Sequence, residues 1–298
     1  MKNLLFLTTF VVYRLIDRGY LMNIDQNTSL IVTTYNNPAF LKLSIISILK
    51  QTILPAEIVI ADDGSTDETY QTILELKKIS AIPIIHVWQP DKGFRAGTIR
   101  NIAIAATQKE YIIQIDGDIV ADKHFIADHL LHKKNNTLLQ GSRVFISPDK
   151  TKQMILCNDT SLSFFSDGLK RRENAIRSKF ISTYLSTRYR NRYPHYYARG
   201  CNMSFFRQDF IRVNGYNDSF NGWGHEDSEL TLRMLNAGCQ KDYIKFHCVA
   251  YHLYHKELSR AMEPENKTIM DQQVKLNSKW CEYGVDQYLH TYLNYIKV

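Results

Sequence analysis

Two acidic residues that follow a short apolar segment are the first candidates for chemistry. Asp116 and Asp118 are separated only by Gly117, directly after Tyr111–Ile115. The segment has the length and composition of a buried parallel strand, and a glycine permits a tight turn or the close approach of a ligand. Two neighbouring carboxylates repel each other unless a cation lies near both. The pattern indicates a divalent metal site, although a solvated loop can carry the same three residues.

A second group of candidate residues lies between Gly222 and Asp227. Trp223 stands between two glycines, and Glu226 and Asp227 begin an expected helix whose apolar side includes Leu230. Acids are common in the first turn of a helix because the helix dipole favours them, and Trp223 could simply pack. An aromatic ring beside a carboxylate is also the arrangement that a sugar with a reacting hydroxyl requires.

Two histidines, His252 and His255, follow in the segment Val249–His255. In an extended chain, residues three positions apart lie on opposite faces, so we expect the two imidazoles to point in opposite directions. A single histidine is usually a polar group with a structural partner. Beside a pair of carboxylates, an imidazole is a suitable third ligand for a metal such as manganese.

Segments of strand and helix type alternate from Ser29 onward, which predicts an α/β fold with a mostly parallel sheet and right-handed crossovers. The expected strands are Leu30–Thr33, Glu57–Ala61, Ile84–Val87 and Tyr111–Ile115, with helices over Leu41–Leu49, up to Leu76, and over Thr98–Ala106. Ligands of such sheets bind beyond the carboxyl ends of the strands. The polar clusters at 34–36, 62–65 and 116–118 all follow strands, so the fold should bring them to one edge.

The second half of the chain changes character. Residues 149–194 interleave basic and aromatic side chains, which suits nucleic acid or a membrane surface but more commonly marks a solvated, partly mobile insertion that covers a cleft. A strand over Met203–Phe206 and a short helix over Asp209–Val213 follow. Residues 261–298 have the pattern of amphipathic helices that form a C-terminal tail.

The composition is that of an ordinary globular protein, with 298 residues, 44% hydrophobic and 22% charged. A net charge of +7 favours anionic partners such as nucleotide phosphates, an acidic membrane surface or nucleic acid. Five scattered cysteines without a CxxC pair indicate neither a zinc cluster nor a disulfide framework, and fit a reducing cytoplasm. We interpret residues 1–21 as an extension from an upstream start, because Met22 precedes the first clear strand. A peripheral membrane anchor, too short to span a bilayer, is the competing interpretation.

Taken together, these motifs resemble the family 2 glycosyltransferases of the GT-A fold. Within that family, the chain is similar to bacterial polymerising, capsule and lipopolysaccharide enzymes with a galactosyltransferase-like C-terminal half. The resemblance covers Ser29–His255 and rests on five short motifs in family order: Thr34-Tyr35-Asn36, Asp62–Asp67, Arg100-Asn101, Asp116-Gly117-Asp118 and Gly222–Asp227. Each motif is weak alone; their order makes the resemblance specific.

The resemblance implies a role for each matching residue. A nucleotide-sugar site is expected from Thr34, Tyr35, Asn36, Asp62, Asp63, Arg95, Arg100 and Asp116. Asp118 and His252 are expected to bind Mn²⁺ or Mg²⁺, with His255 as the alternative to His252. Asp227 would be the catalytic base, and Trp223, Glu226 and Asn202 would hold the acceptor. His225 stands where relatives often carry a small or amide residue, which puts the acceptor's identity in doubt.

These roles imply a metal-dependent, inverting transfer from a UDP-sugar to a hydroxyl of a glycan or lipid-linked saccharide, in surface polysaccharide synthesis. We expect a cytoplasmic protein, at the inner face of the membrane if it associates peripherally, with no nucleic-acid partner. The expected layout is a GT-A domain over 22–260, with a donor half at 29–148 and an acceptor half at 195–260. The alternatives are a non-catalytic nucleotide- or glycan-binding module and a sugar-nucleotide nucleotidyltransferase. The latter needs a glycine-rich phosphate loop after the first strand, and residues 34–38 contain no glycine.

Overall fold

A computed structural model describes residues 23–189, 195–256 and 259–297, without the side chains of 185–189. The expected extension at 1–21 and residues 190–194 of the insertion lie outside the described residues. The strands are β1 (Ile24–Thr34), β2 (Leu54–Asp62), β3 (Ile84–Trp88), β4 (Tyr111–Asp116), β5 (Ile119–Ala121), β6 (Thr137–Gln140), β7 (Arg143–Ile146), β8 (Leu169–Lys170), β9 (Asn202–Phe206), β10 (Gln240–Tyr243), β11 (Ala250–His252) and β12 (Ile296–Lys297). The α-helices are α2 (Pro38–Leu49), α3 (Asp67–Ile79), α4 (Ala96–Ala106), α5 (Phe125–His132), α6 (Pro148–Cys157), α7 (Lys179–Tyr189), α8 (Arg207–Arg212), α9 (Glu226–Asn236) and α10 (Glu263–Leu276).

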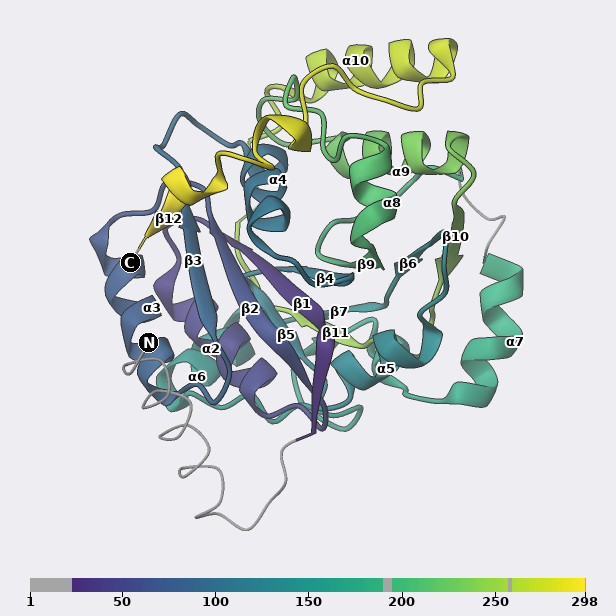
Figure 1. Ribbon diagram of the computed structural model, residues 1–298. Coiled ribbons are helices and arrows are strands. Elements are labelled where there is room, and N and C mark those ends of the chain that lie inside the picture. Colours follow the sequence, from purple (N-terminus) through teal and green to yellow (C-terminus); the bar gives the residue numbers. More distant parts are fainter. Residues whose placement is uncertain (1–22, 190–194, 257–258, 298) are drawn as a thin grey trace.

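Within the described residues, the main sheet has eight strands in the order β10-β6-β9-β4-β1-β2-β3-β12 (Figure 1). The strands β4, β1, β2 and β3 are parallel neighbours, and β6 is parallel to β10. In contrast, β9 runs antiparallel to β4 and β6, and β12 runs antiparallel to β3. The mostly parallel α/β architecture predicted from the sequence is therefore confirmed.

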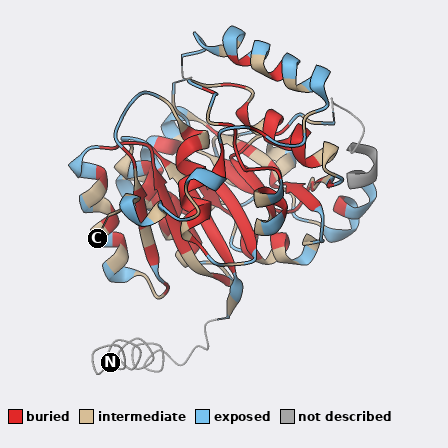
Figure 2. Cartoon of the chain, turned by 45° about the horizontal axis from the view of Figure 1, so that its top comes forward, coloured by how far each residue is buried: buried red, intermediate tan, exposed pale blue. Residues whose placement is uncertain are grey.

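Alternate residues of the central strands enter two hydrophobic cores on opposite faces of this sheet. Leu30 and Val32 pack with side chains of α2, α3 and α5, whereas Ile31 packs with those of α4, α8 and α9. Such alternation is expected of a strand that is buried on both faces, and Figure 2 shows the central strands as almost wholly buried. Because helices cover both faces, the strand ends are the part of this sheet that a ligand can reach.

A smaller sheet with the order β5-β11-β7-β8 adjoins the main one. In it, β11 pairs antiparallel with β5 and parallel with β7, and β8 pairs antiparallel with β7. The expectation of a solvated insertion over 149–194 needs correction, because β8 belongs to this sheet. Arg177 also forms an ion pair with the buried Asp128 of α5, with 2.6 Å between Nη2 and Oδ1. The basic and aromatic composition had suggested solvation, yet part of the segment is structural.

The C-terminal tail also differs from the expected series of helices. After α10, which lies beside α9, the chain makes the 3₁₀ turns η2 (Val285–Gln287) and η3 (Tyr292–Tyr295) and ends in β12 at the edge of the main sheet (Figure 1). The tyrosines of this segment pack against the core beneath α4 from these short turns. The tail thus contains one helix, α10, as predicted, whereas these tyrosines, whose spacing resembles that of a helix face, lie in short turns.

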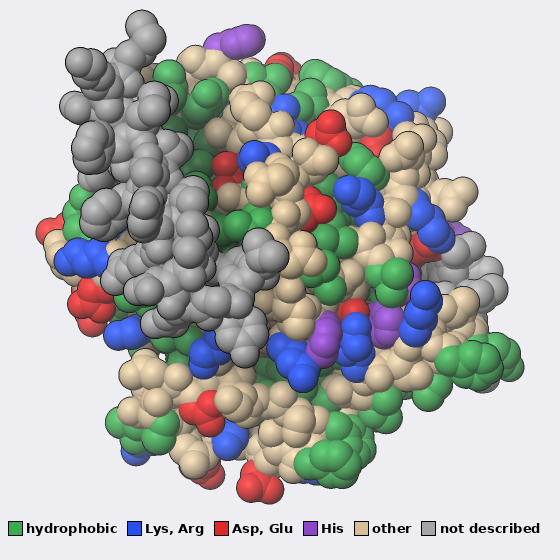
Figure 3. All heavy atoms as spheres, turned by 60° about the horizontal axis from the view of Figure 1, so that its bottom comes forward, with side chains coloured by type: hydrophobic (Ala, Val, Ile, Leu, Met, Phe, Trp, Pro, Cys, Tyr) green, Lys and Arg blue, Asp and Glu red, His purple; other side chains and the backbone are tan. Residues whose placement is uncertain are grey.

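The surface carries the positive charge expected from the composition. In the space-filling view of Figure 3, Lys, Arg and His side chains lie next to one another in a band across one face. Phe165, Phe180 and Tyr184 of the insertion are largely exposed. Among the described residues, no helix combines the length and apolar composition needed to cross a membrane.

A buried polar network centred on His129 fixes α5 against β9 and β4. His129 Nε2 lies 3.0 Å from Asn202 Oδ1, and His129 Nδ1 lies 2.8 Å from Ser204 Oγ, which also contacts the Tyr111 hydroxyl at 2.7 Å. The amide nitrogen of Asn202 donates to the carbonyls of Ser142 and Cys248, so its oxygen accepts and His129 Nε2 donates. Nδ1 is therefore the acceptor in a neutral imidazole, and burial lowers the pKa of His129 to about 4.

This network predicts acid sensitivity. The unfolded chain takes up a proton on His129 near pH 6.5, whereas the folded chain does so only near pH 4. The contribution of neutral His129 to the free energy of unfolding is therefore complete above pH 6.5. It falls as the pH drops to about 4, by up to about 1.4 kcal/mol per pH unit. His129→Gln supplies a donor and an acceptor without titrating, so its unfolding free energy should decline less steeply over this range in urea titrations. Exposed His290→Gln is the control; equal slopes for His129→Gln and wild type would contradict the assignment.

Candidate active site

The turns after β1, β2 and β4 lie against one another at one edge of the sheet. The backbone N–H of Gly117 donates to the Thr33 carbonyl at 2.7 Å, and that of Asp63 donates to the Thr34 carbonyl at 3.0 Å. A Cβ on Gly117 would lie 3.0 Å from the Thr33 oxygen, so a small residue is needed there. The structure thus brings together the three polar clusters, as the parallel-strand argument predicted.

The two acids at the end of β2, Asp62 and Asp63, mainly build the loop of the expected nucleotide site. Asp62 is buried, accepts from Ser65 N at 2.8 Å, and lies 2.9 Å from His86 Nε2. Asp63 is also buried and accepts from the Gln89 amide and from Arg95 N at 2.7 Å. Burial raises the pKa of Asp63, although these hydrogen bonds lower it. Both acids are therefore held within the protein.

The residues after β1 lie nearer to solvent. Tyr35 is 49% exposed, and its hydroxyl donates to Asp91 Oδ2 at 2.8 Å. Thr34 is buried beneath it. Asn36 has a left-handed backbone (φ 45°), accepts from Thr66 N through its side chain, and donates its own N–H to Ser65 Oγ. The exposed Tyr35 ring is thus the accessible member of this group.

The loop before α4 closes this side of the site. Arg95 precedes α4, its Nη2 donates to the Pro90 carbonyl at 2.6 Å, and its Nε is buried without a hydrogen-bond partner. Gly64 (φ 96°) lies so close to Asp91 that an added Cβ would be 2.5 Å from the Asp91 nitrogen. Glycine is therefore required in this turn.

Arg100 of α4 joins the acid after β4 to the expected base at the start of α9. Its Nη2 donates to Asp116 Oδ1 at 2.7 Å, its Nη1 donates to Asp227 Oδ1 at 3.2 Å, and its Nε donates to Thr33 Oγ1 at 3.0 Å. The Arg100 side chain is only 4% exposed, compared with 32% for Asp116 and 17% for Asp227. Burial raises the pKa of Asp116 to about 6, with Asp118 and Asp227 adding to the rise and Arg100 opposing it. Arg100, expected at the nucleotide, forms a bridge between two carboxylates in the structure.

Asp227 is held from three sides. Besides Arg100, the Tyr216 hydroxyl lies 3.1 Å from Oδ1, and the backbone N–H of Gly200 donates to Oδ2 at 2.6 Å. A Cβ on Gly200 would lie 2.3 Å from Oδ1, so this approach depends on glycine. The carboxylate is thus fixed in direction while remaining partly accessible.

A buried ion pair anchors the helix that carries Asp227. Glu229 and Arg233 are both fully buried, with 2.7 Å between Nε and Oε1 and 2.6 Å between Nη2 and Oε2. Arg233 also donates to the carbonyls of Val213 and Gly215, next to Tyr216. Removing one partner of a buried ion pair typically costs about 3–5 kcal/mol. The pair therefore holds α9 and the Tyr216 loop in one arrangement.

Asp118, His252 and His255 form a cluster suited to a metal ion. Asp118 Oδ2 lies 3.3 Å from His252 Nε2 and 2.9 Å from His255 Nε2, and ligand atoms of all three lie within 4.8 Å of one another. The cluster arises because His252 pairs with Ile119 across β11 and β5 and because Leu253 N donates to the Asp118 carbonyl. The other carboxylate oxygen, Oδ1, is buried without a hydrogen-bond partner. An orphaned buried oxygen beside two imidazoles fits a cation.

The expectation that the two histidines point in opposite directions is wrong. β11 ends at His252, so the chain turns before His255 and returns its ring to within 5.1 Å of the His252 ring. Burial lowers the pKa of His252, whereas the hydrogen bond to Asp118 raises that of His255 to about 9. Burial acts to raise the pKa of Asp118, but the two histidines lower it overall.

The expected acceptor residues only partly come together. Glu226, next to Asp227, is buried and accepts from Gly224 N at 3.0 Å; burial, with Asp227 adding to it, raises its pKa to about 7. The Arg260 guanidinium lies 5.0 Å from the Trp223 ring centre. Asn202 was also expected to contact the acceptor, but its side chain is buried. Its amide oxygen accepts from His129 and its amide nitrogen donates to the Ser142 carbonyl, so the side chain is not accessible to a ligand here.

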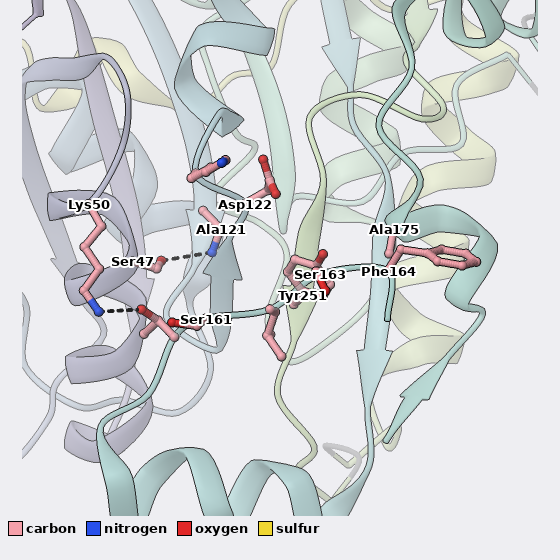
Figure 4. Close-up of a pocket in the computed structure, with 12 residues that line it drawn as sticks. Ser47, Lys50, Ala121, Asp122, Ser161, Ser163, Phe164, Ala175 and Tyr251 are labelled. Atoms are coloured by element: carbon pink, nitrogen blue, oxygen red, sulfur yellow. Dashed lines mark hydrogen bonds between the residues drawn. The ribbon is translucent and has the colours of Figure 1, made fainter. Parts of the chain in front are cut away.

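A cavity of about 500 Å³ lies elsewhere, between the end of α2, β5 and the loop before β8 (Figure 4). Lys50 Nζ donates there to Thr160 Oγ1 at 3.1 Å, and Tyr251 contributes to its wall. Tyr251 precedes His252 in β11, and successive strand residues point to opposite faces. None of the expected site residues lines this cavity.

Several supporting residues were not found from the sequence. Tyr216, Gly200 and Asp91 contact expected site residues from loops without a recognised motif. Arg143 lies on β7, beside β11. After Gly141, Arg143 and Phe145 alternate with the apolar residues Val144 and Ile146. This alternation could have predicted a strand with Arg143 and Phe145 on one face.

The comparisons with known proteins agree with this geometry. Residues 29–213 match the family described as Glycosyl transferase family 2, and residues 179–256 match the N-terminal domain of galactosyltransferase. The first match covers more than half of the 298 residues.

The named relatives share about a quarter of their aligned residues with this chain and are longer than it. Over 230 residues the chain is 26% identical to a chondroitin synthase of Escherichia coli, covering 72% of this chain and 33% of that protein. It is 26% identical to a hyaluronan synthase of Pasteurella multocida over 70% of this chain and 23% of that protein. A validoxylamine A glucosyltransferase of Streptomyces hygroscopicus subsp. limoneus is 24% identical over 70% of this chain and 48% of that one. The chain thus spans less than half of each of these relatives.

Solved structures support the same fold. GalNAc-T7 with UDP, GalNAc and Mn²⁺ aligns with a TM-score of 0.58 at 15% identity, covering 83% of this chain and 47% of that one. S. aureus TarS residues 1–349 in complex with UDP aligns with a TM-score of 0.57 at 17% identity, covering 90% and 71%. Together with the family match, the fold and the clustered motifs, they lead to one conclusion: the chain belongs to glycosyltransferase family 2 and is a glycosyltransferase of the GT-A fold.

Proposed function

We propose that this glycosyltransferase moves a sugar from a UDP-sugar to a hydroxyl of a glycan or lipid-linked saccharide, with inversion and with a divalent metal. The observation that carries the proposal is the bridge from Asp116 through Arg100 to Asp227, because it sets a candidate base beside the acidic motif at the strand ends. The named relatives include polysaccharide synthases. Surface polysaccharide synthesis is the setting that we propose for this chain as well.

The donor would lie over the strand-end loops. Tyr35 offers a half-exposed ring for the base of the nucleotide, and Asp63 and Arg95 stiffen the loop beside it. The two similar structures with UDP support a UDP-sugar as the donor class. Thr34, Asn36 and Asp62 would shape this site from below, since Asn36 and Asp62 are hydrogen-bonded within the loop and the Thr34 carbonyl accepts from Asp63 N.

Asp227 would act as the general base. Its carboxylate takes the proton of the acceptor hydroxyl while the hydroxyl oxygen forms a bond to the anomeric carbon; the bond from that carbon to the diphosphate breaks, and UDP leaves with the electron pair. Arg100, Tyr216 and the Gly200 N–H hold the carboxylate in direction during this step. Trp223 and Glu226 lie next to Asp227 in sequence and would contact the acceptor.

Asp118, His252 and His255 would hold the metal. When bound, it would supply Lewis-acid neutralisation of the charge that develops on the diphosphate. Of the two metals expected, the mixed set favours Mn²⁺, because Mg²⁺ prefers oxygen ligands and water whereas imidazole suits transition metals. The orphaned Asp118 Oδ1 supports the fit.

The cytoplasm, at the inner face of the membrane, is the location that we propose. The five cysteines, all free, suit a reducing compartment. Exposed aromatic side chains and a basic band would favour an anionic membrane surface that carries lipid-linked acceptors.

Asp227→Asn should lower kcat by about 10²–10⁴-fold, because the amide cannot accept the acceptor's proton. The affinity for UDP should change little, since the substitution lies on the acceptor side. Rates of UDP release with an acceptor, together with calorimetric UDP binding, test this. Asp286→Asn, an exposed acid away from the site, is the control. Near-native turnover in Asp227→Asn would exclude this residue as the base.

Asp118→Asn should remove the metal-dependent part of UDP binding, because the cluster loses its only carboxylate. Calorimetric titration of UDP with Mn²⁺ and with a chelator gives the difference. Wild type should bind more tightly with Mn²⁺, and the variant should show equal affinities in both conditions. Asp122→Asn, whose carboxylate accepts from His124 N, is the control from the same segment. If Asp118→Asn retains the wild-type response to Mn²⁺, the metal assignment fails.

A further inference from the structure

Arg143 is a cation beside the metal cluster that the mechanism above does not use. It lies on β7 opposite Ala250 of β11, and two residues later Phe145 pairs with His252. Residues two apart in a strand share a face, so Arg143 lies on the face of the small sheet that carries His252. The Phe145 ring confirms this placement, since its centre is 5.7 Å from the His252 ring and 4.6 Å from the Arg143 guanidinium.

The partners of Arg143 do not neutralise its charge. Its Nη1 donates to Cys201 Sγ at 3.6 Å, and burial raises the pKa of Cys201 to about 12, so this partner is a neutral thiol. A thiol is a weak acceptor. The Nε of Arg143 is buried without a hydrogen-bond partner. In the described part of the chain, no carboxylate lies within 4.0 Å of Arg143 in an ion pair.

The neighbouring carboxylates are already engaged. Asp116 and Asp227 share Arg100, and Asp118 lies between two histidines. A partly buried cation without an anionic partner is costly, so this position suits an anion that arrives with a ligand.

The insertion places a second cation against the Phe145 ring. The Arg171 guanidinium lies 5.7 Å from the centre of the Phe145 ring, and the Asn174 side chain of the following turn donates to the Arg143 carbonyl at 3.1 Å. Arg171 has a left-handed backbone (φ 56°), in the turn after β8. The basic insertion therefore contributes a positive charge on the Phe145 ring, which itself contacts His252.

We propose that Arg143, assisted by Arg171, binds the diphosphate of the nucleotide donor from the side of the small sheet. The inference rests on the proposed UDP-sugar donor and deepens it. A guanidinium suits phosphate oxygens because its N–H groups form a planar fork. Arg143 would hold the diphosphate beside Asp118 and stabilise the charge on UDP as it leaves.

Calorimetric binding of UDP and UMP to the full chain tests the proposal. Arg143→Gln should weaken UDP binding by about 10- to 100-fold, the value of one or two charge-assisted hydrogen bonds, and should change UMP binding much less. Retained UMP binding also shows that the variant is folded. Arg143→Lys keeps the charge without the fork and should lie between wild type and Arg143→Gln. Arg172→Gln, which removes a cation from the Phe164 ring in the same insertion, is the matched control and should bind UDP like wild type.

Four results would overturn the inference. Unchanged UDP affinity in Arg143→Gln, or equal losses for UDP and UMP, would exclude a diphosphate contact while leaving the donor class intact. A loss seen only with a donor whose sugar carries a carboxylate, and not with UDP, would assign Arg143 to the sugar instead. Wild-type protein that binds no UDP would refute the donor class itself, and this inference with it.

Discussion

The site depends on one buried cation between two carboxylates. Arg100 reaches Thr33 at the end of β1, Asp116 at the end of β4 and Asp227 at the start of α9. Burial alone would lower the pKa of Arg100, but the neighbouring acidic groups hold it well above its usual range. Without this cation, Asp116 and Asp227 would repel each other across the edge of the sheet. Arg100 therefore connects the ends of β1 and β4 to the start of α9.

The small sheet performs the corresponding task for the metal cluster. Asp118 and His252 are 134 positions apart in sequence, and they meet because β11 pairs with β5 directly after Asp118. The same strand pairing sets β7, with Arg143 and Phe145, beside His252. One short element thus brings ligands and a cation to a single place. The buried Glu229–Arg233 pair fixes α9, which carries Asp227, in a comparable way.

The main elements and the edge of the site could be predicted from the sequence because they depend on local patterns. Apolar segments that end at Thr34, Asp62 and Asp116 predicted three strands, and the parallel arrangement predicted that their carboxyl ends meet at one edge of the sheet. Long-range pairing could not be predicted in this way. His255 lies beyond the end of β11, and its ring is 5.1 Å from that of His252. The side-chain oxygen of Asn202 is occupied by His129, and the tail tyrosines belong to short turns instead of a helix. The network around Arg100 was also missed, since an arginine in a helix gives no sign of which carboxylates it will meet.

The central claim is that the strand-end edge is a metal-assisted nucleotide-sugar site with Asp227 on its acceptor side. The most direct test is a crystal structure of the chain with Mn²⁺ and UDP, with the ion located by its anomalous scattering. The account predicts one anomalous peak, from an ion coordinated by Asp118 and at least one of His252 and His255. The UDP diphosphate should bind this ion, and the uracil should lie near the Tyr35 side chain. An ion and nucleotide located elsewhere, for example in the cavity between α2 and β5, would contradict the account.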